Sequence, residues 1–346
     1  AEGDDGYRVF MNGKSMVDAW LRNRWGAKQF ILPVKKDSSY TLVVEHYQTE
    51  GPAMMRLHTG HFEKTDMVPL LIKCADADAI VFVGGISPQL EGEEMPVTIP
   101  GFKGGDRTSI LLPAVQTELM KTLKISGKPV VFVMMTGSAI ATPWESENIP
   151  AIVNCWYGGQ SAGTAVADVL FGDYNPAGRL PVTFYKSDSD LPDFKEYDMT
   201  NRTYRYFQGE VLYPFGYGLS YTTFMYSGLK VPASLARNKK MTVSITVKNT
   251  GKKDGEEVVQ LYVAHAYIKG RTPLRALKGF RRILLKAGES KLVTFTLAPE
   301  QLSLVSEENG QFYQPDDKIT ISIGGGQPGV KNKTTSNVIS KSLIVR

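Results

Sequence analysis

The sequence predicts a multidomain chain that combines an α/β part with all-β modules. Three observations lead to this prediction. The chain has 346 residues, which suggests two to three domains of about 150 residues each. Residues 63–200 alternate continuous apolar runs with helical patterns. Residues 1–62 and 227–346 instead alternate apolar and polar side chains with a period of two, as half-buried strands do.

Residues 1–62 are expected to form part of a β-sandwich. Residues 7–13 have the pattern of a strand that runs into Asn12-Gly13, a strong hairpin signal. Residues 30–34 and 40–47 continue the strand pattern. A module of this size with about four strands would be marginal on its own. We therefore expect the first part of this sandwich to lie upstream.

Residues 63–200 are expected to form a largely parallel sheet with helices, because strands that alternate with helices make βαβ units. The expected helices cover residues 65–78, 113–124 and 160–171, and the expected strands cover residues 79–84, 129–135 and 151–156. Ligands of such sheets bind at the loops that leave the carboxyl ends of the strands. The loops of interest are therefore 84–107, 136–150 and 157–159.

The last part of the chain is expected to be a connector followed by a β-sandwich. Residues 201–226 are rich in Tyr and Gly and are typical of an irregular connector. Residues 227–346 contain period-two segments separated by turn signals, which indicates a sandwich. The expected strands cover residues 241–247, 257–263, 291–297 and 318–323.

The net charge of +5 is unevenly distributed. Residues 1–226 carry 20 Lys and Arg against 26 Asp and Glu, whereas residues 227–346 carry 20 against 9. A basic module can bind nucleic acid, but no nucleic-acid motif accompanies these basic turns, so no nucleic-acid partner is expected. The apolar runs are far shorter than the roughly 20 residues of a membrane helix, so no membrane span is expected.

The densest acidic cluster lies in the loop after the first expected parallel strand. Glu91, Glu93 and Glu94 follow one another within four positions. Carboxylates this close repel one another, which raises the pKa of at least one of them. A carboxylic acid that stays protonated near neutral pH is what a general acid requires. A solvated acidic loop without catalytic role is the alternative interpretation.

A second motif is G-x-S-x-G at residues 159–163, centred on Ser161. It falls between an expected strand and an expected helix, the context of a nucleophile elbow in α/β-hydrolases. That mechanism also requires a histidine further along the chain, and only His265 follows, within the expected C-terminal sandwich. Two glycines that let a helix start close to the sheet explain the motif equally well.

Several stretches together resemble glycoside hydrolase family 3. They are GGISPQLEGEEM at 84–95, GGDRTSILLPAVQ at 104–116, WYGGQSAGTAVADVLFGDYNPAGRLPVTF at 156–184, RTYRYF at 202–207 and YPFGYGLSYTTF at 213–224. The resemblance covers roughly residues 66–346 and implies an α/β sandwich followed by a fibronectin type III-like domain. Residues 1–62, with DDGYRVFMNG and MVDAWLRN, look like the C-terminal half of a protective-antigen-like (PA14-like) β-sandwich, which some members carry as an insertion.

The resemblance implies a retaining exo-β-glycosidase that needs no metal and no organic cofactor. Members use an Asp nucleophile on an N-terminal barrel and a Glu acid/base on a loop of the α/β sandwich, which corresponds here to residues 84–107. The family patterns leave Glu91 and Glu93 both open; Glu93 is preferred, Glu91 is second and Glu94 third. Asp106 and Arg107 follow an inserted MPVTIPGFKG. They are expected to anchor the loop or bind substrate, because Arg can hold a carboxylate bidentately.

A (β/α)₈ barrel of about 250 residues does not fit into this chain. We therefore expect the C-terminal portion of an enzyme for oligosaccharide substrates, inactive until a barrel in the same or a separate chain completes it. The residues of these motifs favour a β-xylosidase over a β-glucosidase. The similarity to bacterial enzymes implies a periplasmic or secreted protein, although no signal peptide is visible. A non-catalytic carbohydrate-binding assembly and a serine esterase through Ser161 are the alternatives. The oligomeric state, a homodimer included, stays open.

Overall fold

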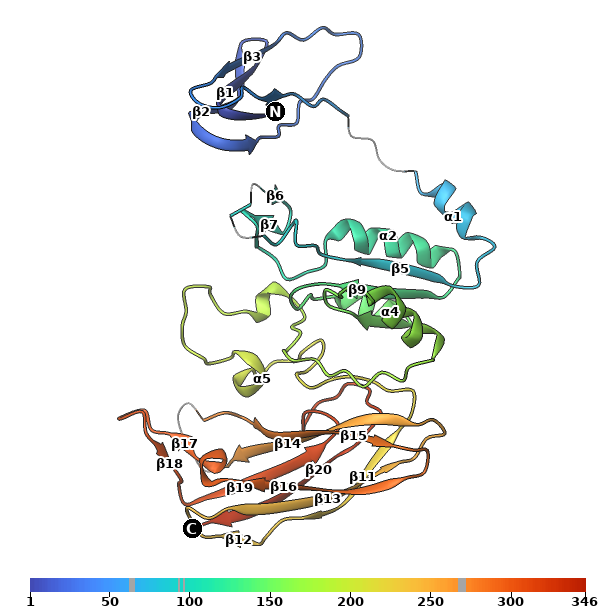
Figure 1. The fold of residues 1–346 in the computed structure, drawn as a ribbon, viewed down its shortest axis with the longest axis vertical. Coiled ribbons are helices and arrows are strands. Elements are labelled where there is room, and N and C mark those ends of the chain that lie inside the picture. Colours follow the sequence, from blue (N-terminus) through green and yellow to red (C-terminus); the bar gives the residue numbers. More distant parts are fainter. Residues whose placement is uncertain (62–65, 93, 96, 267–271) are drawn as a thin grey trace. The chain divides into compact units, whose positions relative to one another are not determined.

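The computed structural model describes residues 1–61, 66–92, 94–95, 97–266 and 272–346. The side chains of residues 22–26 and 98 also lie outside this description. The chain forms two units, and each is described by itself (Figure 1). The first unit comprises Ala1–Lys73 and Gln89–Thr108, and the second comprises Cys74–Pro88 and Ser109–Arg346. The domain boundaries expected at residues 62, 200 and 226 remain predictions.

The first unit opens with an antiparallel sheet in the order β2-β1-β3, with β4 also paired to β1. Its strands are β1 (Glu2–Met11), β2 (Lys14–Ala27), β3 (Leu42–Tyr47) and β4 (Met55–Arg56). Asn12 and Gly13 turn the chain between β1 and β2 with φ angles of 48° and 80°, as the Asn-Gly signal predicts. Tyr7, Val9 and Val17 are buried on this sheet.

The strand expected at residues 30–34 is absent, although the strand expected at 40–47 is confirmed by β3. Phe30 packs against the small core of this sheet, whereas Ile31 and Val34 are exposed. Pro33 has no backbone N–H to give to a sheet, and proline is confined to strand edges for this reason. The segment thus contributes one side chain to the core without pairing as a strand.

The second unit contains a three-stranded parallel sheet in the order β10-β9-β5, which confirms the predicted parallel pairing. The elements of this part are α1 (Val68–Cys74), β5 (Ile80–Gly85), α2 (Ala114–Ile125), β9 (Val130–Met135), α3 (Pro143–Asn148), β10 (Ala151–Asn154), α4 (Ala162–Phe171), η1 (Asp188–Asp190) and α5 (Thr203–Tyr206). Helix α1 crosses from the first unit into the second and is shorter than the helix expected at 65–78. Gly172, with φ 84°, ends α4, as the sequence predicts.

Strand β5 lies at one edge of this sheet and has an exposed apolar face. Val81 is 51% exposed and Val83 is 63% exposed. Because both valines are exposed, this face of β5 is not covered within the second unit. Parallel sheets usually have both faces covered, so β5 departs from the rule.

The C-terminal part of the second unit is a β-sandwich (Figure 1). One sheet has the order β11-β13-β16 and the other has the order β12-β20-β19-β14-β15. The strands of these sheets are β11 (Phe224–Lys230), β12 (Ser234–Leu235), β13 (Met241–Asn249), β14 (Gly255–His265), β15 (Ala276–Leu285), β16 (Ser290–Leu297), β19 (Asp317–Gly324) and β20 (Val338–Val345). A short helix η2 (Pro299–Leu302) and a small hairpin of β17 (Leu304–Val305) and β18 (Phe312–Tyr313) lie between β16 and β19. The four strands expected here are confirmed as β13, β14, β16 and β19.

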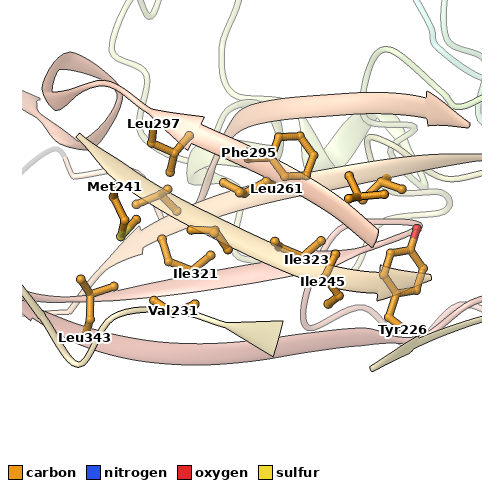
Figure 2. Packing of buried hydrophobic residues seen from close by; sticks show 14 of the residues in the cluster. Tyr226, Val231, Met241, Ile245, Leu261, Phe295, Leu297, Ile321, Ile323 and Leu343 are labelled. Atoms are coloured by element: carbon orange, nitrogen blue, oxygen red, sulfur yellow. The ribbon is translucent and has the colours of Figure 1, made fainter. Parts of the chain in front are cut away.

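The core of the sandwich lies between its two sheets, as Figure 2 shows. Ile245 of β13, Leu261 of β14 and Ile321 of β19 are fully buried in it. In β13 the buried side chains alternate with more exposed ones along the strand, because successive side chains of a strand point to opposite faces. Strands β14 and β19 alternate only over their first four residues, after which several residues are buried in succession. Burial of these aliphatic side chains supplies the main stabilising free energy, about 1.5–3 kcal/mol for each one.

Two glycines explain the FGYGLS part of the connector. The segment 212–218 pairs with the segment 180–184, and the hydrogen bonds include Leu180 N–H to Tyr217 O at 2.8 Å and Gly216 N–H to Leu180 O at 2.7 Å. A Cβ atom at residue 218 would overlap the carbonyl oxygen of Gly178, and one at residue 216 would overlap the Gln260 side chain. Only glycine permits backbone contact this close.

A buried ion pair joins this paired segment to the sandwich. Arg179 Nη2 lies 2.8 Å from Glu257 Oε1 in β14, and the two side chains are only 7% and 0% exposed. Arg179 Nε also donates to the Gly325 carbonyl at 3.1 Å. Burial raises the pKa of Glu257, and the guanidinium of Arg179 opposes that shift. The α/β part and the sandwich therefore meet through a desolvated polar contact.

We expect Arg179→Met to lower the free energy of unfolding by about 3–5 kcal/mol, because it leaves the Glu257 carboxyl buried and unpaired. Arg237→Met is the matched control, since Arg237 forms an exposed pair with Asp316 at 3.5 Å. That control should change stability by less than about 1 kcal/mol. Urea unfolding measures both variants. Equal losses in the two variants would contradict the importance of the buried pair.

Candidate active site

The acidic loop after β5 folds into a small antiparallel sheet in the first unit. Its strands are β6 (Thr98–Ile99), β7 (Phe102–Lys103) and β8 (Asp106–Arg107) in the order β6-β7-β8. Gly101 has a φ of 89° and turns the chain between β6 and β7. Phe102 is buried, with 4% of its surface exposed. Residues 98–103 of the inserted segment thus form a two-stranded hairpin.

Gly105 brings the acidic segment and the Asp106-Arg107 pair together. It has a φ of 88°, and a Cβ atom at this position would overlap the carbonyl oxygen of Gly92. The backbone of Gly92 therefore packs directly against the residue that precedes Asp106. Residues more than ten positions apart in the sequence become neighbours through a contact that only glycine allows.

The three glutamates differ in what the structure describes. Glu93, the preferred acid/base, lies outside the described residues. Glu91 is half-buried, whereas Glu94 is exposed and has a φ of 51°. The positive φ of Glu94 marks the tight turn of this segment, since residues other than glycine adopt it at a cost. Which glutamate carries the proton stays a prediction.

Asp106 and Arg107 lie on the outer strand of the hairpin. Asp106 pairs with Lys103 and Arg107 pairs with Phe102 in the antiparallel register. Arg107 is half-buried and Asp106 is exposed. Their expected role in anchoring the loop or binding substrate remains a prediction, and the shared hairpin is consistent with it.

Two residues that the sequence did not single out fasten the chain where this loop leaves and re-enters the second unit. At the departure, the Gln116 side chain of α2 accepts a hydrogen bond from Gly85 N–H at 2.7 Å and donates one to Gly85 O at 2.6 Å. At the return, Asp188 accepts from Ile110 N–H at 2.6 Å and from the Ser109 hydroxyl at 2.8 Å. No local sequence pattern indicates either contact, because each joins residues at least 31 positions apart.

The geometry around Ser161 does not assemble a hydrolase triad. Ser161 is exposed at the start of α4, and its side chain makes no capping hydrogen bond. His265 Nδ1 lies 2.7 Å from Asp317 Oδ2, with both side chains buried where β14 ends and β19 begins in the C-terminal sandwich. Burial lowers the pKa of His265, and the hydrogen bond to the Asp317 carboxylate opposes this shift. This histidine is part of the sandwich's own packing.

Over the described residues, no group of three or more His, Cys, Asp and Glu side chains is arranged to hold a metal ion. No helix in the described part of the chain is long and apolar enough to cross a membrane. Cys74 and Cys155 are free thiols.

The chain thus combines an α/β part, a glutamate-bearing loop that follows a parallel strand, and a C-terminal β-sandwich. Residues 29–221 match the model of the glycosyl hydrolase family 3 C-terminal domain, and residues 257–327 match that of the fibronectin type III-like domain. The first match covers more than half of the chain. The chain therefore belongs to glycosyl hydrolase family 3, as its motifs predict.

Characterised relatives match this chain with the C-terminal part of their own sequences. A xylan 1,4-β-xylosidase of Xylanibacter ruminicola is 43% identical over 322 residues, which are 92% of this chain and 37% of that enzyme. A periplasmic β-glucosidase of Salmonella typhimurium is 37% identical over 74% of this chain and 34% of its own length. The chain thus spans little more than a third of these relatives.

Solved structures of β-glucosidases share the fold. A β-glucosidase of Erythrobacter marinus matches with a TM-score of 0.69 and 31% identity over 81% of this chain and 36% of its own. The β-glucosidase of Kluyveromyces marxianus in complex with glucose matches with a TM-score of 0.69 and 26% identity. This second match covers 100% of this chain and 42% of that enzyme, so it includes the N-terminal sheet.

We expect Gly105→Ala to break the contact between Gly105 and Gly92, because the new Cβ collides with the carbonyl group of Gly92. Gly104→Ala is the matched control: Gly104 also has a positive φ, 65°, but a Cβ there meets no atom within 4 Å. Amide hydrogen exchange of Val97, whose N–H bonds to Met95 O at 2.7 Å, should become faster in Gly105→Ala than in Gly104→Ala. Equal exchange rates in both variants would refute the constraint.

The lowered pKa of His265 gives a signed prediction for stability. Because burial holds the folded pKa below the ordinary value of about 6.5, the neutral imidazole stabilises the fold above that pH. This contribution is lost as the pH falls below about 6.5 towards the folded pKa. Urea unfolding between pH 7.5 and 4.5 should show a steeper loss in the native protein than in His265→Gln. Parallel pH profiles would contradict this assignment.

Proposed function

We propose that this chain supplies the acid/base half of a retaining exo-β-glycosidase, with terminal β-xylosides favoured over β-glucosides. The observation that carries the proposal is that the loop with the three glutamates directly follows β5 in the sequence of a family 3 chain. Ligand sites of parallel sheets lie at the carboxyl ends of the strands. The preference for xylosides draws support from the xylosidase relative of Xylanibacter ruminicola and from a β-xylosidase of Formosa agariphila that is 38% identical over 283 residues.

In this proposal two carboxyl groups share the reaction. An aspartate of a barrel part attacks the anomeric carbon and forms a glycosyl-enzyme, while Glu93 or Glu91 protonates the departing oxygen. The same glutamate then removes a proton from water, which releases the sugar with retained configuration. The two carboxyl groups must come within about 5–5.5 Å for this mechanism. The contact between Gly92 and Gly105 would keep the glutamate segment in one conformation. It would thereby lower the conformational entropy that is lost when the glutamate is positioned.

The barrel part is the partner that this chain requires in the proposal. The exposed apolar face of β5, with Val81 and Val83, supports a further protein layer over the α/β part. The N-terminal sheet is proposed to be half of a PA14-like module, on the strength of its DDGYRVFMNG and MVDAWLRN segments. A periplasmic or secreted location also belongs to the proposal.

A chimera tests the proposal directly. The N-terminal portion of the Xylanibacter ruminicola xylosidase is joined to this chain in place of its own matching C-terminal part. The chimera and the chain alone are assayed with aryl β-D-xyloside, aryl β-D-glucoside and aryl acetate. We expect xylosidase activity in the chimera and none in the chain alone. Glycosidase activity of the chain alone, or esterase activity without glycosidase activity, would overturn the proposal.

Within the chimera, replacing the acid/base should lower kcat/KM for a xyloside with a poor leaving group by about 10²–10⁴-fold. Glu93→Gln, Glu91→Gln and Glu94→Gln are compared, and we expect the largest loss in Glu93→Gln. The loss should shrink for a dinitrophenyl xyloside, whose leaving group needs no proton. Glu308→Gln, in an exposed turn of the sandwich, is the control and should retain full activity. If none of the three variants loses activity, the acidic loop is not the source of the proton.

A further inference from the structure

A cavity of about 730 Å³ lies within the second unit, between the α/β part, the connector and the C-terminal sandwich. Its volume falls in the range of about 300–1,000 Å³ that small-molecule sites occupy. None of its lining residues belongs to the acidic loop at residues 84–107. The glycosidase mechanism proposed above therefore leaves this cavity without a role.

Three cations and two carboxylates lie around the cavity, and within the described residues one of the cations has no partner. Its lining includes Lys186, Arg275 and Lys331 as cations and Glu147 and Glu210 as carboxylates. Glu210 is neutralised at the rim, where its carboxylate lies 2.8 Å from Lys186 Nζ and 3.5 Å from Lys331 Nζ. The contact with Lys186 lowers the pKa of Glu210, so this carboxylate stays ionised.

Arg275 is the cation that the described residues leave uncompensated. Its side chain is half-buried, and in the described part of the chain no hydrogen bond or ion pair engages its guanidinium. Burial lowers the pKa of Arg275, which reflects this missing compensation. A partly desolvated guanidinium without a partner is well suited to an anion, because its planar donors match a carboxylate bidentately.

The cavity also offers groups that recognise hydroxyls. Thr183 and Gln327 line it and are 8% and 5% exposed. The Thr183 hydroxyl and the Gln327 amide oxygen are buried, and neither has a hydrogen-bond partner in the part of the chain that the structure describes. Such groups normally have partners. Phe207 adds an aromatic surface to the lining, of the kind that small-molecule sites commonly contain.

We propose that this cavity binds an acidic sugar, with its carboxylate on Arg275 and its hydroxyl groups on Thr183 and Gln327. The uronic acids are the sugar class with this chemistry. The proposal concerns binding alone and holds or fails independently of the glycosidase activity.

Binding to the full chain of 346 residues tests the proposal. D-glucuronate is titrated by isothermal calorimetry, beside D-glucose, which replaces the carboxylate by a hydroxymethyl group, and acetate, which lacks the ring. We expect saturable binding of D-glucuronate that is about tenfold or more tighter than that of the other two probes. Absence of saturable D-glucuronate binding would overturn the proposal. Acetate binding of equal strength would reduce the site to one for simple anions and would equally overturn it.

Variants then locate the site. Arg275→Gln should weaken D-glucuronate binding by about tenfold or more, because the carboxylate loses its charged partner. Arg237→Gln, at an exposed arginine of the same sandwich, should bind as the native chain does. Methyl NMR of the native chain provides a second measurement that needs no variant: the methyl signals of Leu212 and Leu274, both in the lining, should shift on titration. Unchanged affinity in Arg275→Gln, or unmoved signals of these leucines, would place the ligand elsewhere.

Discussion

The buried pair between Arg179 and Glu257 is the contact on which the second unit depends. It joins the segment after α4 to strand β14, and its partners are almost fully removed from solvent. An ion pair in such a place costs desolvation free energy, which only complete hydrogen bonding offsets. Gln260 adds to the same junction by donating to Gly216 O and to Gly325 O at 3.0 Å each. The sandwich thus supports the α/β part through directional bonds, which specify one orientation better than apolar contact does.

The acidic loop, residues 84–107, is likewise held by specific hydrogen bonds at both of its ends. A loop that carries a catalytic group must be ordered before the substrate reacts, because ordering it in each turnover would cost conformational entropy. Gln116 and Asp188 fix the chain on the two sides of the loop, and the approach of Gly105 to Gly92 closes the hairpin within it. The inserted segment adds the strands β6 and β7, while Gly92 still packs against Gly105, which directly precedes Asp106.

Strong local patterns were enough to predict most of the elements. The apolar runs of β5, β9 and β10 form parallel strands as expected, and the Asn-Gly turn and the strands of the sandwich also appear. Only β9 is mostly buried, whereas β5 has an exposed face and β10 is half-buried or exposed. Strand β15 was missed because it is an edge strand in which Phe280 and Leu284 are exposed, so its alternation is weak. Helix α3, six residues long, is too short to show a helical period. Its buried Glu145 accepts a hydrogen bond from Thr117 of α2 at 2.6 Å, a tertiary contact that no local pattern reveals.

By itself the sequence determined the family, the order of its α/β and β parts and the loop that carries the glutamates. These follow from side-chain periodicity and from motif residues, both of which are local properties of the chain. Only the tertiary structure decided that Gly92 packs against Gly105, that His265 pairs with Asp317 and that Arg275 lines a cavity where no described residue pairs with its guanidinium. Each of these depends on where distant segments meet. Burial and pairing are set by packing in three dimensions, so a linear pattern cannot contain them.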